Sequence, residues 1–227
     1  MKVKLLNQTH PEWDATTLER YQALYDGGED WRKHLNYWLP QNAAEPTDIY
    51  ADRLKRAIYH NYVGGIIGIL VGYLFSEAPQ VEGAVGTWYE EFLENVDRRD
   101  TPLNRFWRER FGDALVGRDS YVWVNAPALP EGVEVKSRAD EEALGLDRLY
   151  LVGLSSQHVL DWGEDEHGNL VWLMFRQVIQ QRTSVESERG VTWRWTYIDS
   201  EVIRRWDWSA RKDRVKPNDD DVAAALA

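Results

Sequence analysis

The sequence predicts an α+β fold in which N-terminal helices precede an antiparallel β-meander. Apolar residues recur at helical spacing through most of the first 116 residues. From Leu149 onward they alternate with a period of two, and short turns separate the segments. Because helices come first and strands come last, α+β is favoured over an alternating α/β arrangement. We expect a mainly helical segment (1–125), a connecting loop (126–148), a sheet segment (149–210) and a frayed or truncated tail (211–227).

The N-terminal part predicts a surface helix over residues 11–25, because its apolar residues are close to helical spacing. Gly27 and Gly28 follow it, and glycine adopts the left-handed conformation that closes helices. A short aromatic segment over 31–39 comes next and stops at Pro40. A polar loop then leads to the next helix.

One long helix is predicted from Thr47 or Asp48 to Phe75. Its second half is apolar nearly all round, so we expect that half to be buried. Gly64, Gly68 and Gly72 repeat every four residues, which lets another backbone approach closely. Tight packing inside a core is the favoured interpretation of this repeat. Since each glycine weakens a helix by about 1 kcal/mol, a kink or break is the alternative.

Two further helices are predicted over 87–96 and 103–116, followed by a short strand over 121–124. The connection over 127–146 carries proline and charge and predicts a surface loop. The sheet segment predicts strands at the following positions: 149–154, 158–162, 171–181, 191–198 and 202–208.

Composition excludes several classes of protein. The 227 residues include 27 basic and 38 acidic side chains, which gives a net charge of −11 and opposes tight, non-specific nucleic-acid binding. Cysteine is absent, so disulfides, thiolate nucleophiles and zinc–cysteine sites are excluded. The apolar run over 62–75 is shorter than the roughly 20 residues that span a bilayer, so no membrane partner is expected.

Motifs for catalysis or for metal and cofactor binding are weak. Ser155 and Ser156 precede His158, but no nucleophile-elbow motif surrounds them. There is no phosphate-binding lysine loop and no dinucleotide fingerprint. Two acidic runs predict solvated segments rather than cation sites: Asp161 with Glu164, Asp165, Glu166 and His167, and Asp219 to Asp221. We therefore expect no enzyme and no catalytic, cofactor-binding or metal-binding residues.

The tryptophans near the C-terminus allow three interpretations. Four of them interleave with arginines along the last two strands: Trp193, Trp195, Trp206 and Trp208, with Arg194, Arg204 and Arg205. The favoured interpretation is a tryptophan-lined sheet face covered by helices, with arginine on the opposite face. Arginine interleaved with aromatic residues is also a platform on which single-stranded bases stack. The same residue types are the usual anchors of protein–protein contacts.

The succession of segments resembles the N-terminal half of tailed-bacteriophage portal proteins. In that family a helix with an aromatic–Asn element leads into an apolar stretch that ends near Phe and Pro. A helix then precedes a strand, and a further strand leads to a hairpin. The matching positions here are Tyr37-Trp38-Leu39-Pro40, Tyr50, Arg53, Arg56 to Tyr62, Leu74-Phe75, Pro79, Leu103 to Gly117, Tyr121 to Val124, Leu149 to Trp162 and Leu170 to Gln177.

The resemblance implies a portal-wing-like fold and a structural role in the virion. Portal subunits, usually twelve, form the ring at one capsid vertex through which double-stranded DNA is packaged and later ejected. They contact capsid protein, terminase and a head–tail adaptor, and they assemble in the host cytoplasm. Family members are about twice as long, so we expect a fragment, a truncated product or one piece of a split portal. No residue that lines the channel or contacts terminase carries over.

Two rivals come from other classes of protein. One is a non-portal binding module whose Trp/Arg-rich sheet recognises a protein or single-stranded nucleic acid. The other is a hydrolase with a dispersed site. A basic patch around Arg194, Arg204 and Arg205 would favour nucleic-acid recognition by the first rival, and a deep pocket with convergent polar groups would favour the second.

Overall fold

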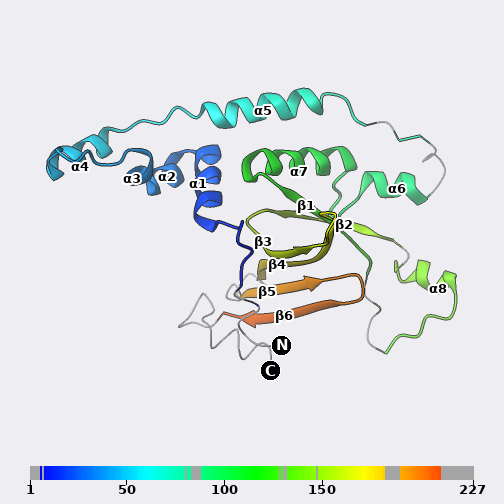
Figure 1. Cartoon of the computed structure of the whole chain (residues 1–227). Coiled ribbons are helices and arrows are strands. Elements are labelled where there is room, and N and C mark those ends of the chain that lie inside the picture. The colour runs from blue at the N-terminus through cyan, green and yellow to red at the C-terminus, as the bar shows by residue number, and fades with distance from the viewer. Residues whose placement is uncertain are drawn as a thin grey trace. The chain divides into compact units, whose positions relative to one another are not determined.

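The computed structural model describes residues 6, 8–79, 81–82, 88–127, 129, 132–146, 148–181 and 190–210. It contains helices and antiparallel sheets, which confirms the predicted α+β fold with its β-meander (Figure 1). The helices are α1 (Ala15–Asp26), α2 (Gly28–Lys33), α3 (Leu35–Trp38), α4 (Thr47–Arg56), α5 (Tyr62–Leu74), α6 (Trp88–Glu94), α7 (Leu103–Gly117) and α8 (Arg138–Ala143). The strands are β1 (Ser120–Asn125), β2 (Tyr150–Ser155), β3 (Val159–Glu164), β4 (Leu170–Gln181), β5 (Gly190–Ile198) and β6 (Ile203–Ser209).

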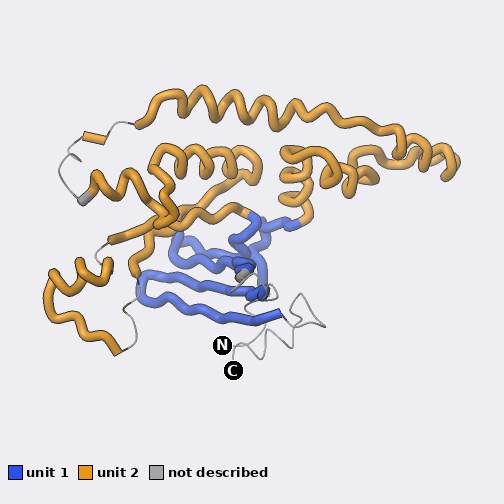
Figure 2. Tube along the Cα trace, turned by 180° about the vertical axis from the view of Figure 1, so that it is seen from behind, with its two compact units in different colours: residues 1–15, 157–227 blue, residues 16–156 orange. Residues whose placement is uncertain are grey.

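The chain divides into two compact units (Figure 2). Unit 1 comprises residues 1–15 and 157–227, and unit 2 comprises residues 16–156. The N-terminal segment thus belongs to the same unit as the C-terminal strands, although more than 140 residues separate them in sequence.

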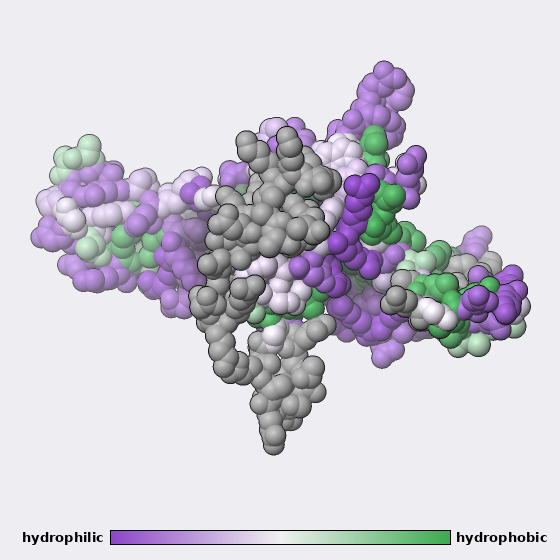
Figure 3. All heavy atoms as spheres, turned by 90° about the horizontal axis from the view of Figure 1, so that it is seen from below, coloured by the Kyte–Doolittle hydropathy of each residue, from purple (hydrophilic) through white to green (hydrophobic). Residues whose placement is uncertain are grey.

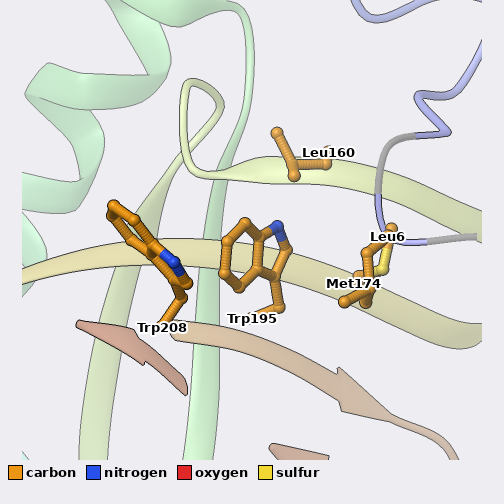
Figure 4. Packing of buried hydrophobic residues seen from close by; sticks show 5 residues of the cluster. All are labelled: Leu6, Leu160, Met174, Trp195 and Trp208. Atoms are coloured by element: carbon orange, nitrogen blue, oxygen red, sulfur yellow. The ribbon is translucent and has the colours of Figure 1, made fainter. Parts of the chain in front are cut away.

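Unit 1 is built on a four-stranded antiparallel sheet in the order β3-β4-β5-β6. The longest ladder joins β4 to β5 and runs from Leu173 opposite Ile198 to Gln181 opposite Gly190. One core cluster lies on this sheet and includes Leu6 of the N-terminal segment (Figure 4). Its buried members are Leu6, Leu160, Met174, Trp195 and Trp208. A backbone hydrogen bond of 2.9 Å from His10 N to Leu160 O also ties the N-terminal segment to β3.

Unit 2 contains a two-stranded antiparallel sheet, β1-β2, that packs against α7. Its core consists of Val96, Phe106 and Leu151, with Phe92, Leu103 and Val122 around them. Backbone hydrogen bonds fix the loop before α7, because Val96 N donates to Thr101 O at 2.9 Å and Leu151 N donates to Val96 O at 2.6 Å. Helix α5 lies alongside α7 in the same unit (Figure 1).

The predicted strand over 149–154 exists as β2, but it does not extend the C-terminal sheet as we had expected. It pairs with β1, from Tyr150 opposite Asn125 to Ser155 opposite Ser120. Both partners are short strands of apolar and aromatic residues, so the alternation of side chains alone does not reveal which strand pairs with which.

The long helix predicted over 48–75 is two helices, because residues 57–61 interrupt it. Ala57 has an extended backbone with ψ of 131°. Asn61 starts the second helix, since its Oδ1 accepts a hydrogen bond from Gly64 N at 2.8 Å. Its Nδ2 donates to Tyr25 O at 2.7 Å, which fastens the start of α5 to the end of α1. Tyr59 adds a second link, donating to Leu24 O at 2.7 Å and stacking on the Trp31 ring at 5.1 Å.

The prediction that this apolar second half is buried is wrong. Of the residues in α5, only Ile67 and Val71 are buried. The predicted tight packing of the glycine repeat is also wrong for two of its members, because a Cβ added at Gly68 or Gly72 would meet nothing within 4 Å. It holds for Gly64, where an added Cβ would lie 2.9 Å from Tyr25 O. The helix therefore contacts its own chain along one narrow face.

The connection over 127–146 contains a helix that we did not predict. In α8 the Ser137 side chain accepts a hydrogen bond from Asp140 N at 3.2 Å, and the Asp140 carboxylate accepts from Ser137 N at 2.9 Å. This reciprocal capping box starts a helix without any help from buried side chains. The spacing of Ser137 and Asp140 is the sequence signal for this capping box, but the signal is weak because Asp stands where Glu or Gln is more usual.

Replacing two neighbouring glycines of α5 with alanine is expected to change the free energy of unfolding in opposite directions. Gly64→Ala should lower the free energy of unfolding by about 1–3 kcal/mol, because the new Cβ meets the Tyr25 carbonyl oxygen. Gly65→Ala should raise it by about 1 kcal/mol, because its Cβ meets nothing within 4 Å and alanine favours the helix. Chemical denaturation of both variants measures this difference. An equal response of the two would contradict the close approach of α5 to α1.

Candidate functional site

The weak candidates for catalysis and metal binding lie near the end of β2 and in the turn after β3. Within those residues, no three His, Asp or Glu side chains gather as a metal-binding group. Ser156 lies at the end of β2, where its hydroxyl hydrogen-bonds the Asp119 backbone as both donor and acceptor. This serine closes the junction between α7 and β1, which is a structural role. His158 contributes its backbone carbonyl to the sheet, accepting from Arg176 N at 2.8 Å.

The acidic run between β3 and β4 forms a hairpin turn. Asp165 Oδ1 accepts from His167 N and from Asn169 N, each at 2.8 Å, and Oδ2 accepts from Asn169 Nδ2 at 2.9 Å. The hydrogen bonds from Asn169 and from the backbone hold the pKa of Asp165 below its ordinary value. Gly168 completes the turn with a φ of 77°. The carboxylate is thus occupied in shaping the turn. The second acidic run, Asp219 to Asp221, lies outside the described residues.

The tryptophans of the C-terminal strands share one face of the sheet. Trp193 lies opposite Trp208, and Trp195 opposite Trp206, and directly paired residues project to the same side. Trp195 and Trp208 are buried beneath Leu6 and Leu160 (Figure 4). In unit 1, the N-terminal segment helps to cover this face, whereas we had expected helices to do so.

The arginines divide between the two faces. Arg194 pairs with Asp207 and Arg205 with Thr196, so both lie on the side away from the tryptophans, as predicted. Arg204 pairs with Tyr197 and shares the tryptophan side, which differs from the prediction. Arg194 is held by Asp207 in a bidentate ion pair, with Nε–Oδ1 at 2.7 Å and Nη2–Oδ2 at 2.6 Å. Trp195 and Trp208 are buried and Arg194 is paired, so these three side chains are not available to stacked bases, whereas Trp193 and Trp206 are half-buried and Arg204 and Arg205 are exposed.

The Arg194–Asp207 pair should make stability depend on pH at the acid end. The hydrogen bond from Arg194 lowers the pKa of Asp207 below its ordinary 3.8. The pair therefore stabilises the fold above pH 3.8, and this contribution disappears as the pH falls through the lowered pKa. We expect Asp207→Asn to cost about 0.5–1 kcal/mol at pH 7, a small value because solvent screens the half-exposed pair.

Urea denaturation of the wild type and Asp207→Asn across pH 2 to 7 tests this expectation. The difference between the two proteins should vanish at the acid end. Glu164→Gln, which removes an exposed carboxylate at the end of β3, is the matched control and should leave the profile unchanged. A difference that persists undiminished at low pH would show that the pair contributes through packing alone.

The most unusual surface of the described chain is on α5. Seven large apolar side chains on this helix are exposed, Tyr73 at 84% and Ile69 and Tyr62 at 72% among them. We call this set the α5 outer face: Tyr62, Val63, Ile66, Ile69, Leu70, Tyr73 and Leu74. No acidic or basic side chain occurs in the helix. On the face that Figure 3 shows, hydrophilic residues are the most frequent of the described ones, with apolar patches between them.

A groove lies beside this helix within unit 2. It has a volume of about 570 Å³ and is bordered by α5 and α7. We call it the α5–α7 groove. Half of its lining is apolar or glycine (Tyr25, Ile67, Gly68, Val71, Gly112 and Val116), and the other half is polar or charged (Gln22, Arg105, Arg108, Glu109, Arg110 and Asp113). Within this lining, Arg105 pairs with Glu109 at 3.0 Å and Arg110 pairs with Asp113 at 2.8 Å. The glycines leave it open, since a Cβ added at Gly68 or Gly112 would meet nothing within 4 Å.

The sequence pattern identifies the residues of α5 as an apolar helix, but it predicts that they lie in a core. The signal for an exposed site was present, because an apolar helix without a charged residue must be covered by something. Among the described residues, only Ile67 and Val71 of this helix are covered. The groove was missed altogether, because it depends on α5 and α7 lying side by side.

No helix among the described residues combines the length and hydropathy needed to cross a bilayer. Neither a protein-family model nor a curated protein matches this chain. The functional assignment therefore depends on the residues and their geometry.

Proposed function

We propose that this chain is a structural subunit of a tailed-bacteriophage portal, or a part of one. It contributes wing structure to the ring at the capsid vertex through which double-stranded DNA is packaged and ejected. In this role the chain is not an enzyme. Its partners are further copies of itself and capsid protein, with terminase and a head–tail adaptor contacting the complete portal. The assembled protein belongs to the virion.

The observation that carries this proposal is the α5 outer face. Monomeric proteins rarely leave contiguous apolar patches larger than a few hundred Å² uncovered, and larger patches mark contacts with other macromolecules. Here the patch is presented by a helix that is fastened at its start by Asn61 and Tyr59. A rigid, uncharged, apolar helix suits a permanent contact between subunits of an assembly.

Charge supports the same role. With a net charge of −11, the chain repels DNA phosphate, which suits a protein past which DNA must slide. Arg194, a candidate for phosphate contact, is occupied by Asp207. We therefore expect weak DNA binding by the isolated chain.

Closing a ring requires one surface patch to meet a different patch on the next subunit.

The test is the oligomeric state of the chain and of the longest product of its gene. The longer product should form a closed ring with a central channel, while the 227-residue chain should be monomeric or weakly associated at micromolar concentration. Light scattering coupled to size exclusion measures the mass, and electron microscopy shows the shape of any large species. A stable two-fold dimer formed through β5 and β6 would refute the portal assignment.

A DNA-binding measurement separates the proposal from the binding-module rival. Fluorescence anisotropy with a single-stranded oligonucleotide should show at most weak binding at physiological salt. Salt-sensitive, sub-micromolar affinity that is lost in Arg204→Ala/Arg205→Ala would favour the rival.

A further inference from the structure

We propose that the α5 outer face of one copy docks into the α5–α7 groove of a second copy. The contact is heterologous, because a projecting surface on one subunit meets a hollow on the next. The inference rests on the proposed function for its place in a ring, and it names the surfaces through which neighbouring subunits meet.

The two surfaces point in different directions from the same helix. At about 100° per residue, Gly68 on the groove side lies about 160° around the helix from Ile66 and about 140° from Tyr73. One copy can therefore insert its outer face into a neighbour while its own groove receives another copy. Such a contact propagates from head to tail and closes into a ring when the rotation between copies permits.

The surfaces are complementary in shape. The outer face projects large side chains, with Ile69 and Tyr73 the most exposed of its aliphatic and aromatic members. The groove offers a volume of about 570 Å³ and two glycines, Gly68 and Gly112, beside which there is free space. Exposed isoleucine and tyrosine side chains facing a glycine-lined hollow form a knob-and-hole arrangement.

The electrostatics favour this pairing over other contacts between copies. Two copies with a net charge of −11 repel each other over most of their surfaces. The outer face carries no charged group, so it approaches without that penalty. The groove lining carries three arginines against two carboxylates, so it adds no net negative charge to the contact.

The outer face by itself is large enough for a stable contact, and the groove receives only part of it. Seven large side chains, most of them more than half exposed, offer an area comparable with the about 800 Å² that each partner buries in a standard interface. A lipid surface fits less well, because 13 residues of helix extend only about 20 Å and interfacial helices need a polar face that α5 lacks.

Disulfide trapping tests the contact, and the absence of cysteine makes it unambiguous. The full chain is prepared as Tyr73→Cys, on the outer face, and as Gly112→Cys, in the groove. After mild oxidation at high protein concentration, the 1:1 mixture should give a covalent dimer containing one of each variant. Each variant alone should remain at least tenfold less cross-linked. The double variant should produce a ladder of oligomers on a non-reducing gel.

Surface variants provide the control. Adding Ile69→Asp to the Tyr73→Cys chain should reduce the mixed dimer at least tenfold, whereas Leu170→Asp, at an exposed leucine of β4, should leave it unchanged. A Tyr73→Cys dimer as abundant as the mixed one would indicate a two-fold α5–α5 contact and overturn the proposal. No cross-link at any concentration, or flotation with anionic vesicles that depends on Ile69, would also overturn it.

Measurements on the longer gene product separate a failure of the docking proposal from a failure of the portal assignment. If rings of the longer gene product persist with Ile69→Asp, the docking proposal is wrong and the portal assignment stands. If the mixed disulfide forms but the longer product yields only open chains or dimers, the contact is correct and the portal assignment is wrong.

Discussion

Replacing Trp195 with alanine is expected to lower the free energy of unfolding of unit 1 by about 3–5 kcal/mol. Trp195 is the largest side chain that the structure buries almost completely, at 1% exposure. It lies in the middle of β5, opposite Arg176 of β4 and Trp206 of β6, and packs in the cluster that contains Leu6. Removing the indole would leave a cavity that three strands and the N-terminal segment cannot close without moving.

Two matched variants separate cavity formation from loss of polar groups. The Trp195 Nε1 is buried without a hydrogen-bond partner among the described residues, so Trp195→Phe removes an unsatisfied donor while keeping most of the ring. We expect it to cost less than half as much as alanine. Val178→Ala, at a 46% exposed position on the same side of the sheet, should change stability by less than about 0.5 kcal/mol.

Equilibrium denaturation followed by tryptophan fluorescence and by circular dichroism measures these differences. Trp195→Ala should also expose the amides of β4, β5 and β6 to hydrogen exchange. A loss below 1 kcal/mol with the alanine variant would show that the cluster around Leu6 does not hold unit 1 together.

The fold class followed from the sequence because each half of the chain obeys a single period. The alternation of Trp193 and Trp195 with polar residues places one face of β5 in a core, and the structure buries Trp195 on that face. Thr196 on the other face is buried as well, which the alternation does not predict. Helix α7 was predicted almost to the residue, since its apolar spacing is regular and Gly117 ends it. Local patterns of this kind are sufficient to predict a helix or strand whose core-facing side chains recur with a single period.

Other features depend on contacts that no local pattern contains. The break at residues 57–61 is held by hydrogen bonds from Tyr59 and Asn61 to carbonyls at the end of α1, more than 30 residues earlier. The pairing of β2 with β1 depends on α7 bringing Ser120 next to Ser155. Periodicity predicts an element and its face, while such distant partners decide where it ends and what it contacts.

The candidate site illustrates the same limit. The residues of α5 stood out in the sequence as an apolar run with a glycine repeat, and this pattern fits a buried helix as well as an interface helix. Only the structure distinguishes the two, because it shows Ile67 and Val71 covered and Tyr73 exposed. By contrast, the division of Trp195 and Arg194 between opposite faces followed directly from their adjacency in a strand.

Replacing Phe106 with alanine is expected to lower the free energy of unfolding of unit 2 by about 3–5 kcal/mol. Phe106 of α7 is 4% exposed and packs between Val96 and Leu151, so it joins the helix to β2 and to the loop over residues 95–101. The hydrogen bond from Leu151 N to Val96 O lies in the same contact, and a cavity there would weaken both. Because α5 packs on α7, the variant should also loosen the α5–α7 groove.

Hydrogen exchange with mass spectrometry shows whether the effect stays within one unit. The Phe106→Ala protein should lose amide protection in α7, β1 and β2, while β4 and β5 keep theirs, and Trp195→Ala should give the reverse pattern. Trp107→Ala is the matched control, since this neighbouring aromatic residue is 40% exposed and should cost less than about 1 kcal/mol. If Phe106→Ala and Trp195→Ala instead deprotected both units equally, the two units would unfold as one cooperative body. The docking contact would then draw its rigidity from the whole chain rather than from unit 2 alone.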